Sequence, residues 1–272
     1  ASDVYKRQSS DAANALAARV ALFQNKMTDA ANYAEAVLAN SSFSLASTAM
    51  DFSKNWVAGS SSPEIIFAYV NNSRASSPLN FTLYVNDTDG SWNYAPSDWC
   101  YNSLFADDNT LSRKGDVRLK ATFTSQDANR VIKYPNGTYQ LAETSDYTCT
   151  PVVISRISEM YLIKAEALGK TNGAAALVEY MKKRYTTAPS EAAIKALSDK
   201  EYQTLILDER RREFYAEGMR WQDIKRTNRL ELLETLDGRT YLMYYPIPQD
   251  EIDMAGTAAY PQNPGYAGYT GN

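Results

Sequence analysis

Residues 155–168 read SRISEMYLIKAEAL, and the chain continues through the turn GKTNG (169–173) into AAALVEYMKKRY (174–185). Both outer segments have the pattern of helices, and the glycine-containing stretch between them favours a turn. The pair has the length of one helix-turn-helix unit of a tetratricopeptide repeat. This stretch therefore predicts a helical fold built from hairpins.

An alanine-rich segment, residues 11–40, predicts a second hairpin of the same kind. Leu16, Val20 and Phe23 recur at i, i+4 and i+7 and form one apolar stripe. Thr28 is the predicted N-cap of the second helix. The many alanines predict that the two helices approach each other closely. The second helix places three residues on one face, Ala30, Tyr33 and Val37.

A further helix begins at a capping box, with Ser198 as N-cap and Glu201 reaching back to its amide. It is predicted to run through the charged stretch 209–213 and to stop near Gly218. Opposite charges three and four residues apart stabilise a helix surface, and arginine forks can hold a following loop such as 218–223. We therefore assign a structural role, not acid–base or phosphate chemistry, to Glu209, Arg210, Glu213, Arg220 and Asp223.

The helical period fades in residues 43–150, where Ser, Asn, Asp, Gly and Pro separate short apolar runs. Two of these runs, 64–70 and 81–85, predict short strands. A short helix is predicted from Ser97 and carries residues 99–105. Two cysteines, Cys100 and Cys149, either form one disulfide or remain separate thiols, because their spacing carries no geometry.

The composition of the 272-residue chain excludes several classes of protein. Its 28 Lys and Arg against 32 Asp and Glu leave no basic stripe, which argues against nucleic-acid binding. The absence of histidine excludes His-containing catalytic triads and His-ligated zinc, and two cysteines cannot form a four-sulfur zinc site. No run of about 18 apolar residues is present to span a membrane as a helix. We expect neither a metal nor a cofactor.

Several segments, in order along the chain, resemble the SusD/RagB family. Residues 156–167 are similar to the family's R-x-x-E-x-Y-L-x-x-A-E-A helix. Two segments fit the family's middle section less specifically, Pro63–Phe67 and Asp116–Leu119. The resemblance extends from about Asp11 to Tyr266. Its remaining segments are Glu209–Phe214, Glu217–Arg226, Tyr245–Ile252 and Gln262–Tyr266.

The resemblance implies a mainly α fold of tetratricopeptide-like hairpins with a loop-rich, short-strand insertion. We expect one domain, residues 1–272. Its parts are a helical hairpin (11–40), a variable ligand-binding section (43–150), a helical body (155–236) and an extended tail that wraps the body (237–272).

The resemblance also implies a non-catalytic lipoprotein for nutrient uptake at the outer membrane and cell surface of Bacteroidetes-type bacteria. Such a protein binds a glycan, or a peptide in some members, and passes it to a TonB-dependent transporter. Membrane contact would be made only through an N-terminal lipid, which we expect to be absent from this chain. Family members are usually much longer, so we expect a short member, a fragment or a trimmed chain.

Aromatic residues in the middle section are the main functional signal, because sugar rings stack on indole and phenol rings while amides and carboxylates satisfy the hydroxyls. The segment Ser91–Tyr94 follows a glycine turn and precedes Pro96, which favours a platform at a loop tip. Plain core packing is the alternative for each ring. The candidate ligand-binding residues are Trp92, Tyr94, Asn93, Trp99, Tyr84 and Asn86.

Two other classes of function remain open. A helical-repeat scaffold would bind protein through its concave face. A glycosidase needs only two carboxylates, but Asp87/Asp89 and Asp107/Asp108 lie in polar loops where aspartate commonly forms turns. The segment Asn86–Gly90 is similar to a calcium loop but lacks its downstream acidic ligand.

Overall fold

The computed structural model describes residues 9–57, 62–69, 96–123, 131–134, 151–233, 236, 238–256 and 261–267. The chain divides into two compact units, residues 1–215 and 216–272. This division does not test the expectation of one domain over residues 1–272, which stays a prediction. The predicted fold class is confirmed, since the structure consists mainly of helices with a few short strands.

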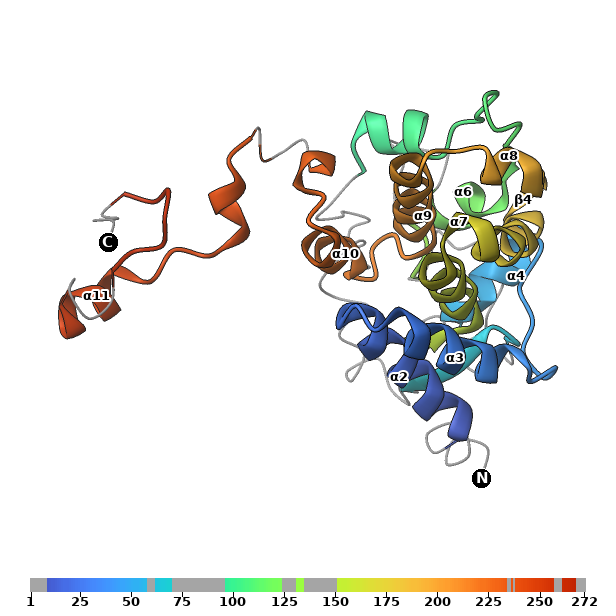
Figure 1. Cartoon of the computed structure of the whole chain (residues 1–272), viewed down its shortest axis with the longest axis horizontal. Coiled ribbons are helices and arrows are strands. Elements are labelled where there is room, and N and C mark those ends of the chain that lie inside the picture. Colours follow the sequence, from blue (N-terminus) through green and yellow to red (C-terminus); the bar gives the residue numbers. More distant parts are fainter. Residues whose placement is uncertain are drawn as a thin grey trace, which may run out of the picture. The chain divides into compact units, whose positions relative to one another are not determined.

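The first hairpin consists of α2 (Ser10–Phe23) and α3 (Met27–Leu38), which lie side by side in Figure 1. The Ser9 side chain caps α2 by accepting a hydrogen bond from the Ala12 amide at 3.1 Å. The contact is made by fully buried alanines, as predicted: Ala15, Ala18, Ala30 and Ala34.

Two predictions for this hairpin are wrong. The apolar stripe is not the buried face of α2, since Leu16 and Val20 are 55% and 47% exposed. Close approach of the helices selects small side chains, so the alanine face turns inward. Thr28 does not cap α3: the helix begins at Met27, and its N-cap residue, two positions before Thr28, is Lys26, which makes no side-chain cap. Tyr33 is exposed, whereas Ala30 and Val37 are buried on the same helix.

The second hairpin is α7 (Ile157–Arg184), whose two helical halves are joined at Gly169 with φ 66° and ψ 175°. The halves cross closely, because a Cβ atom on Gly173 would lie 2.2 Å from the Ala165 carbonyl oxygen. The two predicted helices are confirmed. The first begins at Ile157 instead of Ser155, because the preceding residues form a strand that the sequence did not predict.

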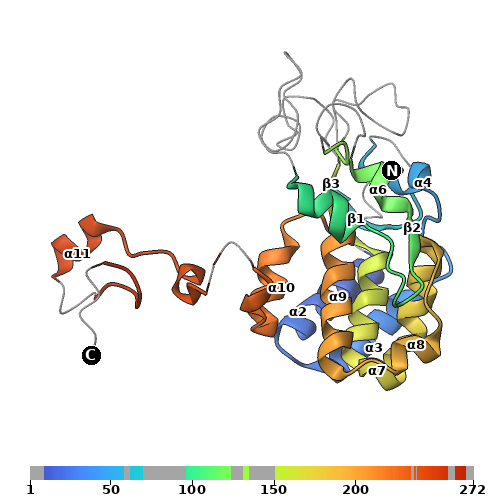
Figure 2. The same cartoon turned by 90° about the horizontal axis from the view of Figure 1, so that it is seen from above.

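Two further helices pack against α7, namely α8 (Glu191–Lys195) and α9 (Asp199–Glu213); Figure 2 shows α7 and α9 side by side. The predicted capping box is confirmed: the Glu201 amide donates to Ser198 Oγ at 3.2 Å, and the Ser198 amide donates to Glu201 Oε2 at 2.7 Å. The helix ends at Glu213 and not near Gly218, where the prediction placed its end.

The strands form two antiparallel ribbons. One pairs β1 (Ile65–Tyr69) with β3 (Val152–Arg156), which confirms the first predicted strand. The other pairs β2 (Lys114–Asp116) with β4 (Tyr185–Thr187). The second predicted strand, 81–85, lies outside the described residues. Short helices complete the middle section: α4 (Ala49–Ser53), η1 (Lys54–Trp56), the π-helical turn η3 (Cys100–Leu104) and α6 (Val117–Thr122).

The second unit contains α10 (Met219–Thr227), η4 (Leu230–Leu232), η6 (Thr240–Met243) and α11 (Gln249–Ala255). The Gln262 side chain binds both backbone groups of Ile247, accepting from its amide at 2.8 Å and donating to its carbonyl at 3.0 Å. The tail is therefore not extended throughout. Its wrapping around the helical body stays a prediction.

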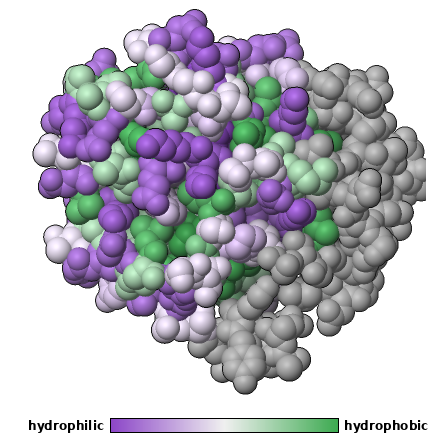
Figure 3. All heavy atoms as spheres, turned by 90° about the vertical axis from the view of Figure 1, so that its right-hand side faces the viewer, coloured by the Kyte–Doolittle hydropathy of each residue, from purple (hydrophilic) through white to green (hydrophobic). Residues whose placement is uncertain are grey.

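The surface of the first unit is mixed in character. On the described part of the face in Figure 3, hydrophobic residues form small islands between hydrophilic ones. Within the described ranges, none of the helices combines the length and the apolar composition that crossing a bilayer requires.

Candidate functional site

A buried charge cluster joins the elements of the first unit. Its side chains are at most a few per cent exposed, although they are charged. The residues of this charge cluster are Glu64, Arg113, Asp116, Arg118, Arg156, Arg184, Glu209, Arg212 and Glu213, with the hydroxyls of Tyr180 and Tyr185.

Glu213, the last residue of α9, pairs with three arginines: Arg156 and Arg184 at short range and Arg118, whose Nη1 lies 3.4 Å from Oε2. Its Oε1 accepts from Arg156 Nη1 at 2.5 Å and from Arg184 Nη2 at 2.9 Å. Its Oε2 accepts from Arg184 Nε at 2.9 Å and from the Tyr180 hydroxyl at 2.8 Å. Such charge-assisted bonds are among the strong ones in proteins. The carboxylate thus ties the end of β3 to α7 and α9.

Glu209 lies one turn earlier on the same side of α9. Its Oε2 accepts from Arg118 Nη2 at 2.9 Å, and its Oε1 accepts from Arg212 Nη1 at 3.0 Å and from the Tyr185 hydroxyl at 2.6 Å. These bonds connect α9 to α6 and to the second ribbon.

Glu64 directly precedes β1 and extends the cluster to the first ribbon. Its Oε1 accepts from Arg184 Nη2 and from the Ala46 amide, each at 2.7 Å. Its Oε2 accepts from Asn55 Nδ2 at 2.9 Å. The charge cluster therefore fixes the start of β1 and the end of β3, the two strands that flank residues 70–151 in the chain.

The carboxylates of Glu209 and Glu213 are ionised near neutral pH. Burial alone would raise the pKa of Glu209, but Arg118, Arg212 and Arg113 outweigh it and lower that pKa to about 2. Arg184 and Arg156 likewise hold the pKa of Glu213 well below its ordinary value against the effect of burial. A carboxylate that does not titrate near pH 7 is a poor general acid or base. The geometry therefore suits a structural role.

The predicted structural residues fall into separate places. Glu209 and Glu213 belong to the charge cluster, so their predicted position on a helix surface is wrong. The Arg210 side chain is also buried, and its guanidinium lies 5.2 Å from the centroid of the Phe214 ring. In the second unit, Arg226 Nε donates to Asp223 Oδ1 at 2.9 Å, and Arg220 Nη2 donates to the Leu232 carbonyl at 3.5 Å.

Sequence reasoning missed most partners in the charge cluster. Glu64, Arg118 and Arg156 lie within the segments that resemble the family, but each was noted only as part of a motif. Arg184, Tyr180 and Tyr185 lie outside the segments that resemble the family. A usable signal was present in Glu64, a single charge beside the apolar run of β1. Their mutual pairing links residues far apart in sequence, which no local pattern reveals.

Trp99 is the described member of the predicted ligand-binding set. Trp99 is 40% exposed, and it precedes η3, whose Cys100 and Leu104 are buried. The guanidinium carbon of Arg211, on α9, lies 4.5 Å from the centroid of the Trp99 ring system. A cation over an indole ring is attracted by its quadrupole, so Arg211 holds the orientation of Trp99.

An aromatic cluster supports the turn that carries Trp99. The Phe123 ring makes edge contacts with Phe105 and Tyr215, at centroid distances of 5.4 and 4.9 Å. Cys100 is a free thiol buried beside these rings, and burial raises its pKa. Cys149 lies outside the described residues. The surface of the turn is polar, since Ser97, Asp98, Asn102 and Ser103 are exposed.

The remaining predicted ligand-binding residues lie outside the described residues: Tyr84, Asn86, Trp92, Asn93 and Tyr94. So do Asp87 and Asp89. Of the other carboxylate pair, Asp108 forms a turn, as predicted, since its Oδ1 accepts from the Thr110 amide at 2.8 Å. Asp107 does not, because its Oδ1 accepts from the Gly115 amide, eight residues away, at 2.8 Å. In the described part of the chain, no three His, Cys, Asp or Glu residues are grouped to hold a metal ion.

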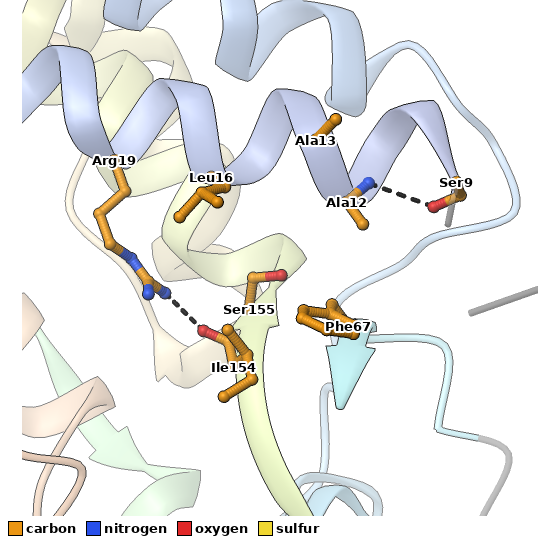
Figure 4. A pocket seen from close by; sticks show the side chains of 8 residues that line it. All are labelled: Ser9, Ala12, Ala13, Leu16, Arg19, Phe67, Ile154 and Ser155. Atoms are coloured by element: carbon orange, nitrogen blue, oxygen red, sulfur yellow. Dashed lines mark hydrogen bonds between the residues drawn. The ribbon is translucent and has the colours of Figure 1, made fainter. Parts of the chain in front are cut away.

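A hollow of about 250 Å³ lies between α2 and the ribbon of β1 and β3 (Figure 4). At one end Arg19 Nη2 donates to the Ile154 carbonyl at 2.5 Å, and at the other end Ser9 caps α2. Most of the lining is carbon. The lining residues are Ser9, Ala12, Ala13, Leu16, Arg19, Phe67, Ile154 and Ser155.

Residues 105–240, half of the chain, match the model of the SusD family. The curated SusD-like protein P38 of Formosa agariphila is 30% identical over 142 residues, which are 47% of this chain and 27% of that protein. The matched part of this chain thus covers about a quarter of the length of that relative.

Solved structures share the fold at lower identity. A SusD-like protein from Bacteroides fragilis is 20% identical with a TM-score of 0.67, covering 98% of this chain and 67% of that one. Surface glycan-binding protein A from Bacteroides thetaiotaomicron, in complex with laminarihexaose, is 21% identical with a TM-score of 0.64, covering 95% and 66%. The family match lies on the elements that bring Arg118, Arg184, Glu209 and Glu213 together. The chain belongs to the SusD family.

Proposed function

We propose that this chain is a non-catalytic protein that binds oligosaccharide or polysaccharide at the cell surface. The observation that carries the proposal is Trp99, an exposed indole held by Arg211 on a turn with a polar surface. An exposed flat ring costs little entropy to order and presents an apolar face. The C–H face of a sugar packs on such a ring, and the neighbouring polar side chains can bind its hydroxyls.

We also propose the predicted residues Tyr84, Asn86, Trp92, Asn93 and Tyr94 as ligand-binding residues. These residues precede Trp99 by 5 to 15 positions in the chain. A row of rings would contact several sugars of one glycan. We expect modest affinity, because a shallow stacking site buries little area and the sugar gives up good hydration.

Names of related structures support a glycan as the ligand. One neighbour is described as a laminarin-binding SusD-like protein, with 23% identity and a TM-score of 0.61. The complex with laminarihexaose belongs to a second neighbour. We further propose delivery of the glycan to a TonB-dependent transporter at the outer membrane, with the full-length precursor anchored by an N-terminal lipid.

Affinity electrophoresis tests the proposal. The parent chain and the Trp99→Ala variant are run through gels that contain laminarin or other soluble polysaccharides. We expect retardation of the parent in at least one gel, and about fivefold weaker binding of Trp99→Ala, since one stacked ring contributes of the order of 1 kcal/mol. Tyr33→Ala is the matched control, because Tyr33 is an exposed ring of similar accessibility on α3.

The outcomes separate the alternatives. Equal retardation of the parent and Trp99→Ala would keep glycan binding and move the site away from Trp99; the Trp92→Ala variant would then test the loop position. A folded parent that no polysaccharide retards would contradict the proposal. Peptide ligands and protein partners would be tested next.

A further inference from the structure

We propose that the hollow between α2 and the first ribbon is a second binding site, for a neutral and mostly apolar ring compound that carries one hydroxyl group. Its volume of about 250 Å³ is below the range of 300–1,000 Å³ that is usual for drug-sized ligands. A ligand of the size of phenol fits this space. The proposal is independent of glycan binding, since Trp99 does not line the hollow.

The first argument is the Ser155 hydroxyl. Ser155 is only 5% exposed, and its Oγ has no hydrogen-bond partner among the residues that the structure describes. Figure 4 shows this oxygen directed into the hollow toward Phe67. A buried polar atom without a partner is costly, so a ligand hydroxyl that binds there would satisfy an existing need.

The second argument is the character of the walls. The methyl group of Ala12, the side chains of Leu16 and Ile154 and the Phe67 ring present carbon. Pockets of this kind bind apolar groups and use a few polar atoms to orient them. A sugar ring is excluded, because most of its hydroxyls would face carbon without a partner.

The third argument concerns charge. Arg19 is the ionisable residue in the lining, and its Nε and Nη2 donate to the Glu159 carboxylate at 2.8 and 2.6 Å. Its Nη2 also donates to the Ile154 carbonyl. The positive charge is therefore balanced inside the protein, and the hollow offers no excess charge to an ionic ligand. We therefore expect the ligand to be an uncharged compound.

Titration with phenol, followed by the methyl NMR signals of Leu16 and Ile154, tests the proposal on the full chain. We expect saturable shifts of these two residues. The Ser155→Ala variant should bind phenol about threefold to tenfold more weakly, the usual worth of one hydrogen bond. It should bind toluene, which has no hydroxyl, as the parent does.

Filling the hollow gives the matched test. Ala12→Leu places extra carbon in the hollow and should weaken phenol and toluene by more than tenfold. Ala17→Leu makes the same change on α2 outside the lining and should leave both affinities unchanged. Absence of saturable shifts in the folded parent, or equal effects of Ser155→Ala on phenol and toluene, would overturn the proposal. If Ala12→Leu does not fold, the comparison of phenol with toluene decides alone.

Discussion

The charge cluster and the α2–α3 hairpin are both buried in the first unit, but they are built in opposite ways. The charge cluster brings together large charged side chains, and each carboxylate accepts several donors. The hairpin brings together alanines with no polar side-chain atoms. The first depends on a complete set of partners, and the second depends on a close fit of small side chains.

This difference predicts how each region responds to substitution. Removing one ion of a buried set leaves its partners charged and unpaired, which is expensive. An alanine contact contains no polar side-chain atoms that could lose a hydrogen-bond partner, but it has no room for a larger side chain. The predictions below test this contrast, beginning with the largest effect.

We expect Glu213→Ala to destabilise the protein by about 3–5 kcal/mol, because it leaves Arg156 and Arg184 buried without their main partner. The free energy of unfolding from urea titration measures this effect. Glu191→Ala is the control, since Glu191 forms an ion pair with Lys195 at 2.6 Å on an exposed surface. That loss should stay below about 1 kcal/mol. Equal effects of the two substitutions would contradict the importance of burial.

Acid should weaken the charge cluster in a defined range of pH. The pKa of Glu209 is about 2 in the folded protein, against an ordinary value of 4.5. The folded-state pKa is the lower one, so its stabilising effect is present above pH 4.5 and is lost as the pH falls toward 2. At neutral pH this contribution is about 3 kcal/mol. Unfolding free energies measured from pH 7 to pH 2 should therefore fall mainly below pH 4.5. Stability that stays constant down to pH 2 would contradict the assignment.

The same contrast explains what the sequence could predict. The capping box, the helix that carries Glu209 and Glu213 and the hairpin at Gly169 follow from local patterns, because caps, charge spacing and turn residues act within a few positions. Burial of Glu213 does not follow, since its partners Arg156 and Arg184 lie 57 and 29 positions away. Charged residues are ordinarily exposed, so the local pattern indicated a surface.

The hairpin shows a second limit. Its helices and its alanine contact could be predicted, but the exposure of its apolar stripe could not. Periodicity gives most weight to bulky residues such as Leu16 and Val20, whereas close packing of two helices selects small ones. For the candidate site, the sequence names Trp99 as a candidate ring but does not indicate the Arg211 side chain that packs on it, which comes from α9.

A larger side chain in the hairpin should cost less than a lost ion in the charge cluster. We expect Ala18→Leu to destabilise the protein by about 1–3 kcal/mol, since Ala18 is fully buried in the core shared by α2, α3 and α7. Urea titration measures the change. The Ala17→Leu substitution next to it, at a partly exposed position, should cost less. A stable Ala18→Leu protein would show that the helices can separate without loss.

The smallest effect is expected on the exposed side of α2. Val20→Gln should change the free energy of unfolding by no more than about 0.5 kcal/mol, because Val20 is 47% exposed and glutamine is a good helix former. Leu22→Gln is the matched control on the same helix, where the side chain is buried and the loss should exceed about 2 kcal/mol. Both values come from the same urea titrations. A loss at Val20 as large as the loss at Leu22 would mean that the apolar stripe of Leu16 and Val20 is covered, and that the alanine face is not the one on which the hairpin depends.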